Sequence, residues 1–396
     1  YGLLPVWELL GNETGTMIGY HAIPVIADAI LKGFNGFDVN HAYDAMKKSA
    51  MQDHLGLNSY KKLGYIADDK EVESVSKTLE YAYDDWCIAQ VANFLDKEED
   101  YKYFSNRAEY YRNLFDPTTN FMRAKLSDGK WKTPFNPRSP EHRNNEYTEG
   151  NAWQYSWFVP QDVEGLISLI SRKETFTQKL DLLFSIDSKL DGENPSSDIS
   201  GMIGQYAHGN EPSQHISYLY NFIGQPWKTQ QKVHQILTTL YNDSPSGLCG
   251  NEDCGQISAW YIFSALGFYP FNPADQNYVI GLPLFDEAII NLSDGKKFVI
   301  KANNLSDKNI YINSAKLNGT NLTKSFITHN DIMNGGLLEF EMSDNPNHNL
   351  WTNHESFPLS MTTITNVDEI DNKEYSEKIK EAFKHAWNAY KKYAWG

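Results

Sequence analysis

Side chains that can do chemistry gather in four glycine-bearing stretches of the sequence, residues 11–22, 144–162, 208–215 and 247–260. The third stretch reads "HGNEPSQH" and combines one carboxylate, two amides and two imidazoles. A loop of this composition can bind a metal ion, bind a polar substrate or simply turn the chain. Loops held by a rigid scaffold often carry binding and catalytic residues, so these stretches are the first places to expect a site.

Two carboxyl groups in these stretches are candidates for acid–base work. Glu149 and Asp253 each lie in a loop with a neighbouring glycine, just before an expected helix. Hydrolysis of a glycosidic bond with inversion uses such a pair, about 6.5–9.5 Å apart. A helix N-terminus favours the ionised form, which suits a base. An acid needs burial beside an aromatic wall, which Trp153 and Trp157 could supply. Each carboxyl alone is more often a partner of the helix dipole than a catalyst.

Helical patterns fill most of the first two-thirds of the chain. Apolar residues recur every three or four positions over 24–34, 41–50, 74–95 and 101–115, which predicts amphipathic or buried helices. The helix over 74–95 contains Asp84 and Asp85 among many aromatic residues, and these two acids could line a polar cavity. Beyond residue 278, short β-branched runs alternate with Asn, Asp, Ser and Gly to about residue 355, which predicts strands and hairpins.

Composition excludes several classes of protein. The net charge is −16, so a nucleic acid partner would need a local basic patch, and the sequence has none. No run of 18 apolar residues occurs, so no membrane span is expected. The three cysteines do not have the spacing of a zinc site. Aromatic residues make up 14% of the chain, and their rings serve cores but also pack on sugar rings.

Five stretches together resemble the catalytic module of glycoside hydrolase family 92, the calcium-dependent exo-α-mannosidases. They are "MIGYHAIPVIADAILKG", "SVSKTLEYAYDDWCIAQ", "YTEGNAWQYSWFVPQD", "IGQYAHGNEPSQHISYLYNFIGQPWKTQ" and "GNEDCGQISAWYIFSALGFYP", in family order, within a likeness that covers about residues 1–350. The resemblance implies a mainly α fold, an (α/α)6 barrel over residues 1–277 and a β-rich segment over 278–356. It also implies a preceding β-sandwich and first barrel helices that this chain lacks.

The resemblance assigns roles to residues of this chain. Glu149 in "TEGNAW" matches the general acid and Asp253 in "NEDCG" the general base, whereas Asn251 stands where some members carry a further Asp. A Ca²⁺ ion is implied, with Asn210 and Glu211 as oxygen ligands, since imidazole is a poor ligand for calcium. The substrate contacts that are implied, or expected from position in these stretches, are His21, Asp84, Asp85, Trp153, His208 and Gln256.

The last residues resemble a different family. The polar stretch at 357–374 reads as a linker, and "EKIKEAFKHAWNAYKKYAWG" is similar to the opening of glycoside hydrolase family 47, so 375–396 would be the first helix of a truncated second mannosidase module. A plain amphipathic helix is the alternative. We expect an inverting, calcium-dependent exo-α-mannosidase acting outside the cytoplasm on N-glycans or mannans. A mannose-binding module without turnover and another (α/α)6 enzyme, such as a polysaccharide lyase, are the rivals.

Overall fold

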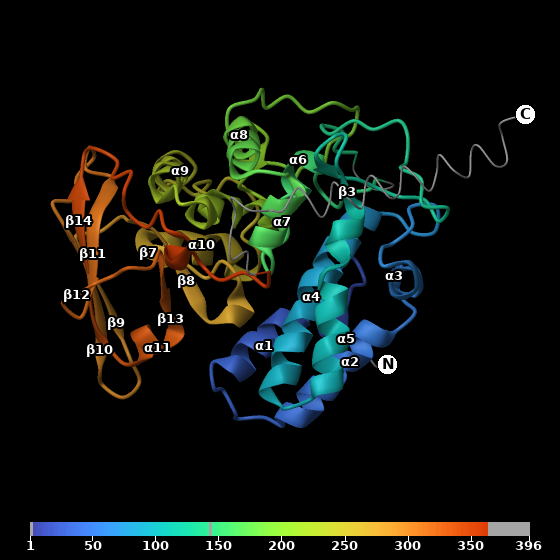
Figure 1. Cartoon of the computed structure of the whole chain (residues 1–396), viewed down its shortest axis with the longest axis horizontal. Helices are drawn as coiled ribbons and strands as arrows, with labels where there is room; N and C mark the ends of the chain where they lie inside the picture. Colours follow the sequence, from blue (N-terminus) through green and yellow to red (C-terminus); the bar gives the residue numbers. More distant parts are fainter. Residues whose placement is uncertain (1–2, 142–144, 363–396) are drawn as a thin grey trace, which may run out of the picture. The chain divides into compact units, whose positions relative to one another are not determined.

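The longest helix, α4 (Ser74–Phe94), organises the N-terminal half of the fold. The computed structural model describes residues 3–141 and 145–362. Nearly every residue of α4 is buried, because apolar side chains surround the helix on all sides and neighbouring helices cover each face. It packs against α5 (Glu98–Ala108), α1 (Ala22–Leu31) and α2 (Val39–Met51), as Figure 1 shows in blue and cyan. The polar residues of α4 must therefore find partners inside the protein.

Shorter elements separated by long loops follow α4 and α5. They are α6 (Ala152–Tyr155), α7 (Val163–Leu169), α8 (Lys173–Leu183), the 3₁₀ helix η3 (Ile216–Ile223), α9 (Pro226–Thr239) and α10 (Gln256–Ala265). Two further α-helices of the described residues are short, α3 (Leu57–Leu63) and α11 (His329–Met333). The loops between them hold three of the four chemically distinctive stretches. Within the described residues, no helix has both the length and the apolar character needed to cross a bilayer.

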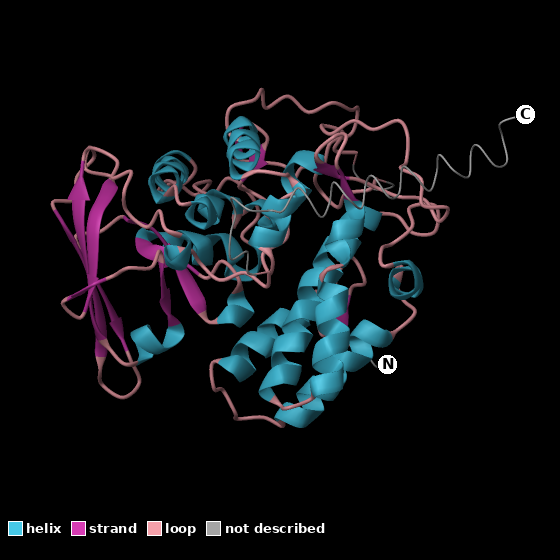
Figure 2. Ribbon diagram, viewed as in Figure 1, coloured by secondary structure: helices cyan, strands magenta, loops and turns pink. Residues whose placement is uncertain are grey.

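A five-stranded sheet forms the C-terminal part of the unit that ends at Met361. Its order is β12 (Thr320–Asn321), β11 (Tyr311–Leu317), β14 (Gly336–Ser343), β10 (Lys297–Asn303) and β9 (Glu287–Asn291), drawn in magenta in Figure 2. The pair β10 and β14 is parallel, with Phe298 opposite Gly336, and the other pairs are antiparallel. Alternate residues of β10 are buried, so one face of the sheet joins the core.

A second sheet lies between the helices and the five-stranded sheet. It contains β13 (Phe326–Thr328), β8 (Asn277–Pro283) and β7 (Leu266–Tyr269). All seven residues of β8 are buried, and one apolar core runs from η3 and α9 through β8 into the larger sheet. This continuity explains why the strands that the sequence predicts after residue 278 pack tightly on the helical part.

The fold contains more strand than the mainly helical expectation. In the described part of the first 277 residues, three two-stranded hairpins occur: β1 (Glu8–Leu9) with β2 (Asn12–Glu13), β3 (Phe115–Asp116) with β4 (Phe121–Met122), and β5 (Met202–Ile203) with β6 (Tyr206–Ala207). Helix α10 also ends at Ala265, where β7 begins. Gly267 takes a positive φ of 97° beside Pro283, which a chain leaving a helix for a paired strand accommodates only with glycine.

Candidate active site

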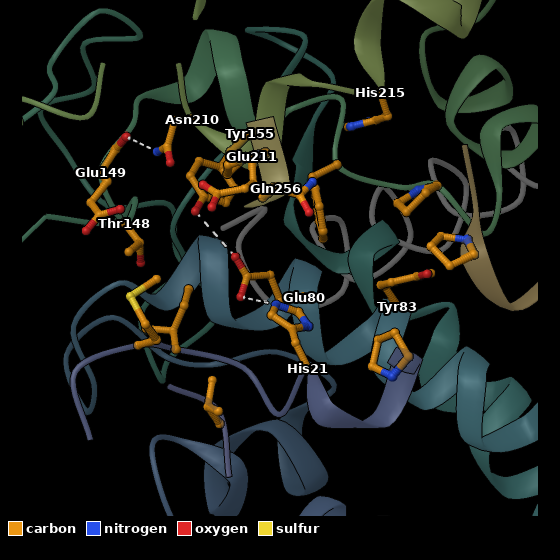
Figure 3. Close-up of a pocket in the computed structure, with 18 of the residues that line it drawn as sticks. His21, Glu80, Tyr83, Thr148, Glu149, Tyr155, Asn210, Glu211, His215 and Gln256 are labelled. Carbon is orange, nitrogen blue, oxygen red and sulfur yellow. Dashed lines mark hydrogen bonds and ion pairs between the residues drawn. The ribbon is translucent and has the colours of Figure 1, made fainter. Parts of the chain in front are cut away.

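One cavity of about 410 Å³ brings together the four stretches that the sequence singles out. Its wall is built from residues 6–24, α4, residues 148–160, residues 210–215, Gln256 and residues 269–273. Figure 3 shows His21 and Glu80 on one wall and Glu211 and Gln256 facing them from another. The stretches meet because α1 packs on α4 and α6 packs on the 3₁₀ turn η2 (Glu211–Ser213), although they lie far apart in the sequence.

Five of the ten predicted site residues line this cavity: His21, Glu149, Asn210, Glu211 and Gln256. The other five, Asp84, Asp85, Trp153, His208 and Asp253, are not part of its wall. Asp253 still belongs to the neighbourhood, because its carboxyl interacts directly with the Glu211 carboxyl.

Glu149 is held in an unusual backbone conformation at the cavity wall. Its φ is +47°, a left-handed conformation that costs a residue with a side chain about 1 kcal/mol or more. The capping box of α6 fixes the chain two residues later, where the Asn151 side chain accepts from Trp153 N and Gln154 N. Asn210 Nδ2 donates to Glu149 O at 2.9 Å. These contacts point the carboxyl into the cavity.

The surroundings of Glu149 raise the pKa of its carboxyl toward neutral pH. Burial raises its pKa to about 7, and the negative charges of Asp198, Glu73, Asp253 and Glu80 add to the increase. All four of these neighbours are acidic, so each disfavours a negative charge on Glu149. A half-buried carboxyl in an acidic cavity favours the neutral form and can donate a proton.

Asp253 begins a strained turn immediately before helix α10. Asp253, Cys254 and Gly255 have φ values of +44°, +57° and +96°, immediately before α10. Consecutive left-handed residues are rare, and they persist where the surrounding fold over-determines them. Asp253 is exposed, so water reaches its carboxylate. The expectation that Glu149 and Asp253 each precede a helix is confirmed.

Glu211 and Asp253 form a pair of adjacent carboxyl groups. Burial raises the pKa of Glu211 to about 7, and the nearby Asp253 charge adds to this. Two amides complete the set. Asn210 uses Nδ2 toward Glu149 and Gln256 uses Nε2 toward Gln214 Oε1, which leaves the amide oxygens Asn210 Oδ1 and Gln256 Oε1 for a ligand. Carboxylate and amide oxygens are the donors that Ca²⁺ prefers, so this set fits calcium.

A Ca²⁺ ion bound by Glu211, Asp253 and the two amides would need further oxygen ligands besides side-chain carboxylates. Within residues 3–141 and 145–362, no three His, Cys, Asp or Glu side chains group as a metal site. Ca²⁺ takes six to eight oxygens, and amides, carbonyls, water and substrate hydroxyls can supply the rest. A bound cation would favour the ionised form of both carboxyl groups.

His21 is clamped between two carboxylates of α4. His21 Nδ1 lies 2.7 Å from Asp84 Oδ1, and His21 Nε2 lies 2.7 Å from Glu80 Oε2. Burial opposes the charged ring, but the two carboxylates outweigh it and raise the His21 pKa well above its usual value. Both ring nitrogens are occupied, so His21 presents a charged ring edge to the cavity and no vacant nitrogen.

Glu80 is a cavity residue that the sequence analysis missed. It lines the wall, accepts from Tyr155 Oη at 3.3 Å and holds His21. The spacing of Glu80 and Asp84 could have revealed it, because residues four apart share one face of a helix. Glu80 lies one helical turn before Asp84, so both side chains project from the same face of α4.

The remaining predicted residues have structural partners. Asp84 and Asp85 are fully buried. Asp85 Oδ2 accepts from Arg107 Nε at 2.7 Å and also from Tyr60, whereas Asp84 accepts from Tyr20 N and His21. This network anchors α1 to α4, so it positions the His21 wall.

His208 and Trp153 lie behind the cavity wall. The His208 ring bonds to Tyr206 Oη at 2.7 Å and Tyr241 Oη at 2.6 Å, and burial lowers its pKa to about 3, so the ring is neutral. Trp153 packs edge-on against Phe121. The aromatic wall expected from Trp153 and Trp157 is instead made by other rings, namely Trp7, Tyr83, Tyr155, Phe158, Tyr269 and Phe271.

Comparison with known proteins places this geometry in a family. Residues 1–344 match the glycosyl hydrolase family 92 catalytic domain. A family GH92 α-mannosidase of Bacteroides thetaiotaomicron, solved with mannoimidazole, is 44% identical, with a TM-score of 0.88 over 96% of this chain and 50% of that one. A GH92 inverting mannosidase of the same organism is 37% identical, with a TM-score of 0.82 over 91% and 50%.

A curated relative gives the same assignment. An uncharacterised secreted glycosidase of Arthroderma benhamiae is 30% identical over 381 residues, which is 86% of this chain and 47% of the relative. This chain therefore spans about half the length of the proteins that it matches. The match extends over most of the chain and includes all four stretches that build the cavity. The chain belongs to glycosyl hydrolase family 92.

Proposed function

We propose that the protein is a calcium-dependent, inverting exo-α-mannosidase that hydrolyses terminal α-mannosides of N-glycans or mannans. The observation that carries the proposal is the contrast between two carboxyls. Glu149 is half-buried with a pKa near 7, whereas Asp253 is exposed to water beside Glu211. One environment suits a proton donor and the other suits a group that activates water. The solved relatives described as an α-mannosidase and an inverting mannosidase supply the sugar and the stereochemistry.

The proposed reaction moves one proton at each carboxyl. Protonated Glu149 donates to the glycosidic oxygen as the bond to the anomeric carbon breaks. Asp253 takes a proton from a water molecule, whose oxygen attacks the anomeric carbon from the opposite face. The products are β-mannose and the shortened glycan, with Glu149 ionised and Asp253 protonated. Exchange of both protons with solvent restores the starting state.

The other cavity residues would bind and orient the sugar. The neutral hydroxyl groups of a sugar can donate hydrogen bonds to the acidic side chains of the cavity wall. The aromatic rings of Tyr83, Tyr155 and Phe158 would pack against the apolar faces of the sugar ring. A calcium ion, when bound, would hold sugar hydroxyls and offset negative charge. Asn210 and Glu211 are the residues we propose as its ligands, and Gln256, His21 and Glu80 as sugar-facing residues. Asp84, Asp85, Trp153 and His208 would position the wall.

Calcium is expected to stabilise the protein as well as support turnover. Binding at a free concentration about 100 times Kd adds about 2.7 kcal/mol to the free energy of unfolding, so Tm should rise by a few degrees on adding CaCl₂ to protein treated with EDTA. Glu211→Gln should weaken this rise, and substitution of the exposed Glu193 by Gln should not. Equal rises in both variants would place calcium elsewhere.

The stereochemistry of the product tests the proposal directly. Proton NMR of a fresh digest of a high-mannose glycan should show β-mannose first, with the α-anomer appearing only as the sugar mutarotates. Immediate α-mannose would exclude inversion. Calcium-dependent binding without any release of mannose would favour the alternative, a mannose-binding module without turnover.

The domain organisation that we propose follows the same family. It comprises an (α/α)6 barrel over residues 1–277, the β-rich segment over 278–356, and a β-sandwich of the same polypeptide as a partner. The linker over 357–374 extends past the described residues, and the helix over 375–396, with its family 47 likeness, lies outside them. Action outside the cytoplasm is proposed because the Arthroderma benhamiae relative is described as secreted.

A further inference from the structure

The turn of the hairpin formed by β5 and β6 lies against the C-terminal end of α8. Gly204 and Gln205 form this turn. Gly204 has a φ of +63°, and a Cβ atom at this position would collide with the Leu183 carbonyl oxygen, so glycine is required for so close an approach. Gln205 N donates to Leu183 O at 2.8 Å. The end of α8 therefore fixes the position of Gln205.

The side chain of Gln205 is fully buried and uses both ends of its amide. Gln205 Nε2 donates to Asp187 O at 2.8 Å and to Lys189 O at 3.1 Å. Gln205 Oε1 accepts from Asn151 Nδ2 at 3.1 Å. The orientation of the amide is fixed, because a backbone carbonyl can only accept. The side chain thus bonds the loop after α8 to the N-cap of α6.

Two bonds link Gln205 to the capping box that follows Glu149 in the sequence. Within the box, the side-chain oxygens of Asn151 and Gln154 accept from backbone N–H groups of the box itself. The two side-chain nitrogens remain, and both donate to Gln205: Asn151 Nδ2 to its Oε1 and Gln154 Nε2 to its main-chain oxygen at 2.9 Å. Gln205 therefore attaches the box to the rest of the fold.

The segment that begins at Gln205 also reaches Glu149 itself. It continues through β6 to Asn210, whose Nδ2 donates to Glu149 O at 2.9 Å (Figure 3). Residues 205 and 210 thus hold the chain at Glu149 and again at Asn151, two residues later. A left-handed residue such as Glu149 persists only where its surroundings fix it. Loss of the Gln205 bonds should therefore let the Glu149 turn relax and redirect its carboxyl.

We propose that Gln205 is a positioning residue that aims the Glu149 carboxyl at the glycosidic oxygen through Asn151 and Gln154. The inference rests on the proposed function, because Gln205 acts only through the proton donor. Gln205 is not part of the cavity wall, so it would not touch the sugar or the reacting atoms. A displacement of about 1 Å at a catalytic group can lower the rate about 10²-fold.

Replacement of Gln205 by Met tests the inference, because Met has a similar length but none of the amide's hydrogen bonds. On an unactivated α-mannoside, kcat per folded protein should fall about 10–100-fold. On a mannoside whose leaving group is a strong acid, it should fall less than about threefold, because that oxygen needs no proton. Asn151→Ser should give the same contrast. Ser can still cap α6 but is too short to reach Gln205.

The matched control is Asn221→Leu, which removes another fully buried amide. Asn221 Nδ2 donates to Ile280 O at 2.9 Å, and Asn221 does not line the cavity. This variant should lower Tm, as Gln205→Met should, but leave the ratio of the two rates at its wild-type value. Circular dichroism gives the folded fraction of each variant.

Several outcomes would overturn the inference while wild-type hydrolysis stands. Equal losses on both substrates in Gln205→Met and Asn151→Ser would make the role of Gln205 purely structural. Wild-type rates in both variants would show that the Glu149 turn does not need Gln205, and the same contrast in Asn221→Leu would attribute it to general destabilisation. Failure of the wild-type protein to release mannose from either substrate is a different result, which would refute the proposed function and the positioning role with it.

Discussion

Substitution of Glu149 by Gln is expected to lower kcat on an unactivated α-mannoside about 10²–10⁴-fold, because the leaving oxygen loses its proton donor. Gln keeps the size of the side chain, and the bond from Asn210 Nδ2 to Glu149 O involves only the backbone. KM should change little. A mannoside whose leaving group is a strong acid needs no protonation, so its hydrolysis should fall far less. The measurement is kcat on both substrates.

The pH profile gives an independent check on Glu149. With a pKa near 7, the wild-type rate should decline as pH rises through 7, because the donor ionises. The variant should lose this alkaline limb. Substitution of Glu146 by Gln is the matched control. Its carboxyl pairs with Lys132 at 3.0 Å, outside the cavity, so the rate should stay within a few-fold of wild type.

The same substitution has a predictable effect on stability. The Glu149 pKa is higher in the folded protein than the ordinary 4.5, so ionisation opposes folding, and stability is lost as pH rises from about 4.5 through 7. Gln cannot ionise, so the variant should be more stable than wild type above pH 7, by at most ~3 kcal/mol before solvent screening. Below pH 4.5 the two should unfold at similar temperatures. Equal curves at pH 8 would contradict the raised pKa.

Substitution of Asp253 by Asn is the second large effect, with an expected loss in kcat of about 10²–10⁴-fold. Here the activated mannoside should be hydrolysed as slowly as the natural one, relative to wild type, because the attacking water still lacks its base however good the leaving group is. The neighbouring Glu252 provides a control, since it bonds to Ser258 at the start of α10. Glu252→Gln should retain most of the activity. Rescue of Asp253→Asn by the activated substrate would assign Asp253 a different role.

The sequence was sufficient to predict the elements whose pattern is local. The helix over 74–95 is observed as α4, and the strands after residue 278 are present, because apolar periodicity and β-branched runs are read within one element. The switch from α10 to β7 at Leu266 was not predictable, since it depends on pairing with β8, which follows in the sequence.

Some residues of the candidate site could be predicted from the sequence and others could not. Residue type and loop position indicated Glu149, and the family resemblance added Glu211 and Gln256; the structure places all three on one cavity. The burial of His208 was not predictable, because it depends on Tyr206 and Tyr241, which are brought to both ring nitrogens by the tertiary fold. A histidine satisfied on both sides is indistinguishable, in sequence, from one that faces a substrate.

The cavity wall draws on segments that run from Val6 to Pro273. A site assembled from such distant parts forms only after the long-range contacts of the chain have formed, so it should appear late in folding. Detachment of any one segment by local unfolding would dismantle it. Catalytic activity should therefore recover in the slowest phase of refolding, after helical circular dichroism has returned, and protease cuts between the lining segments should abolish turnover before the core is lost.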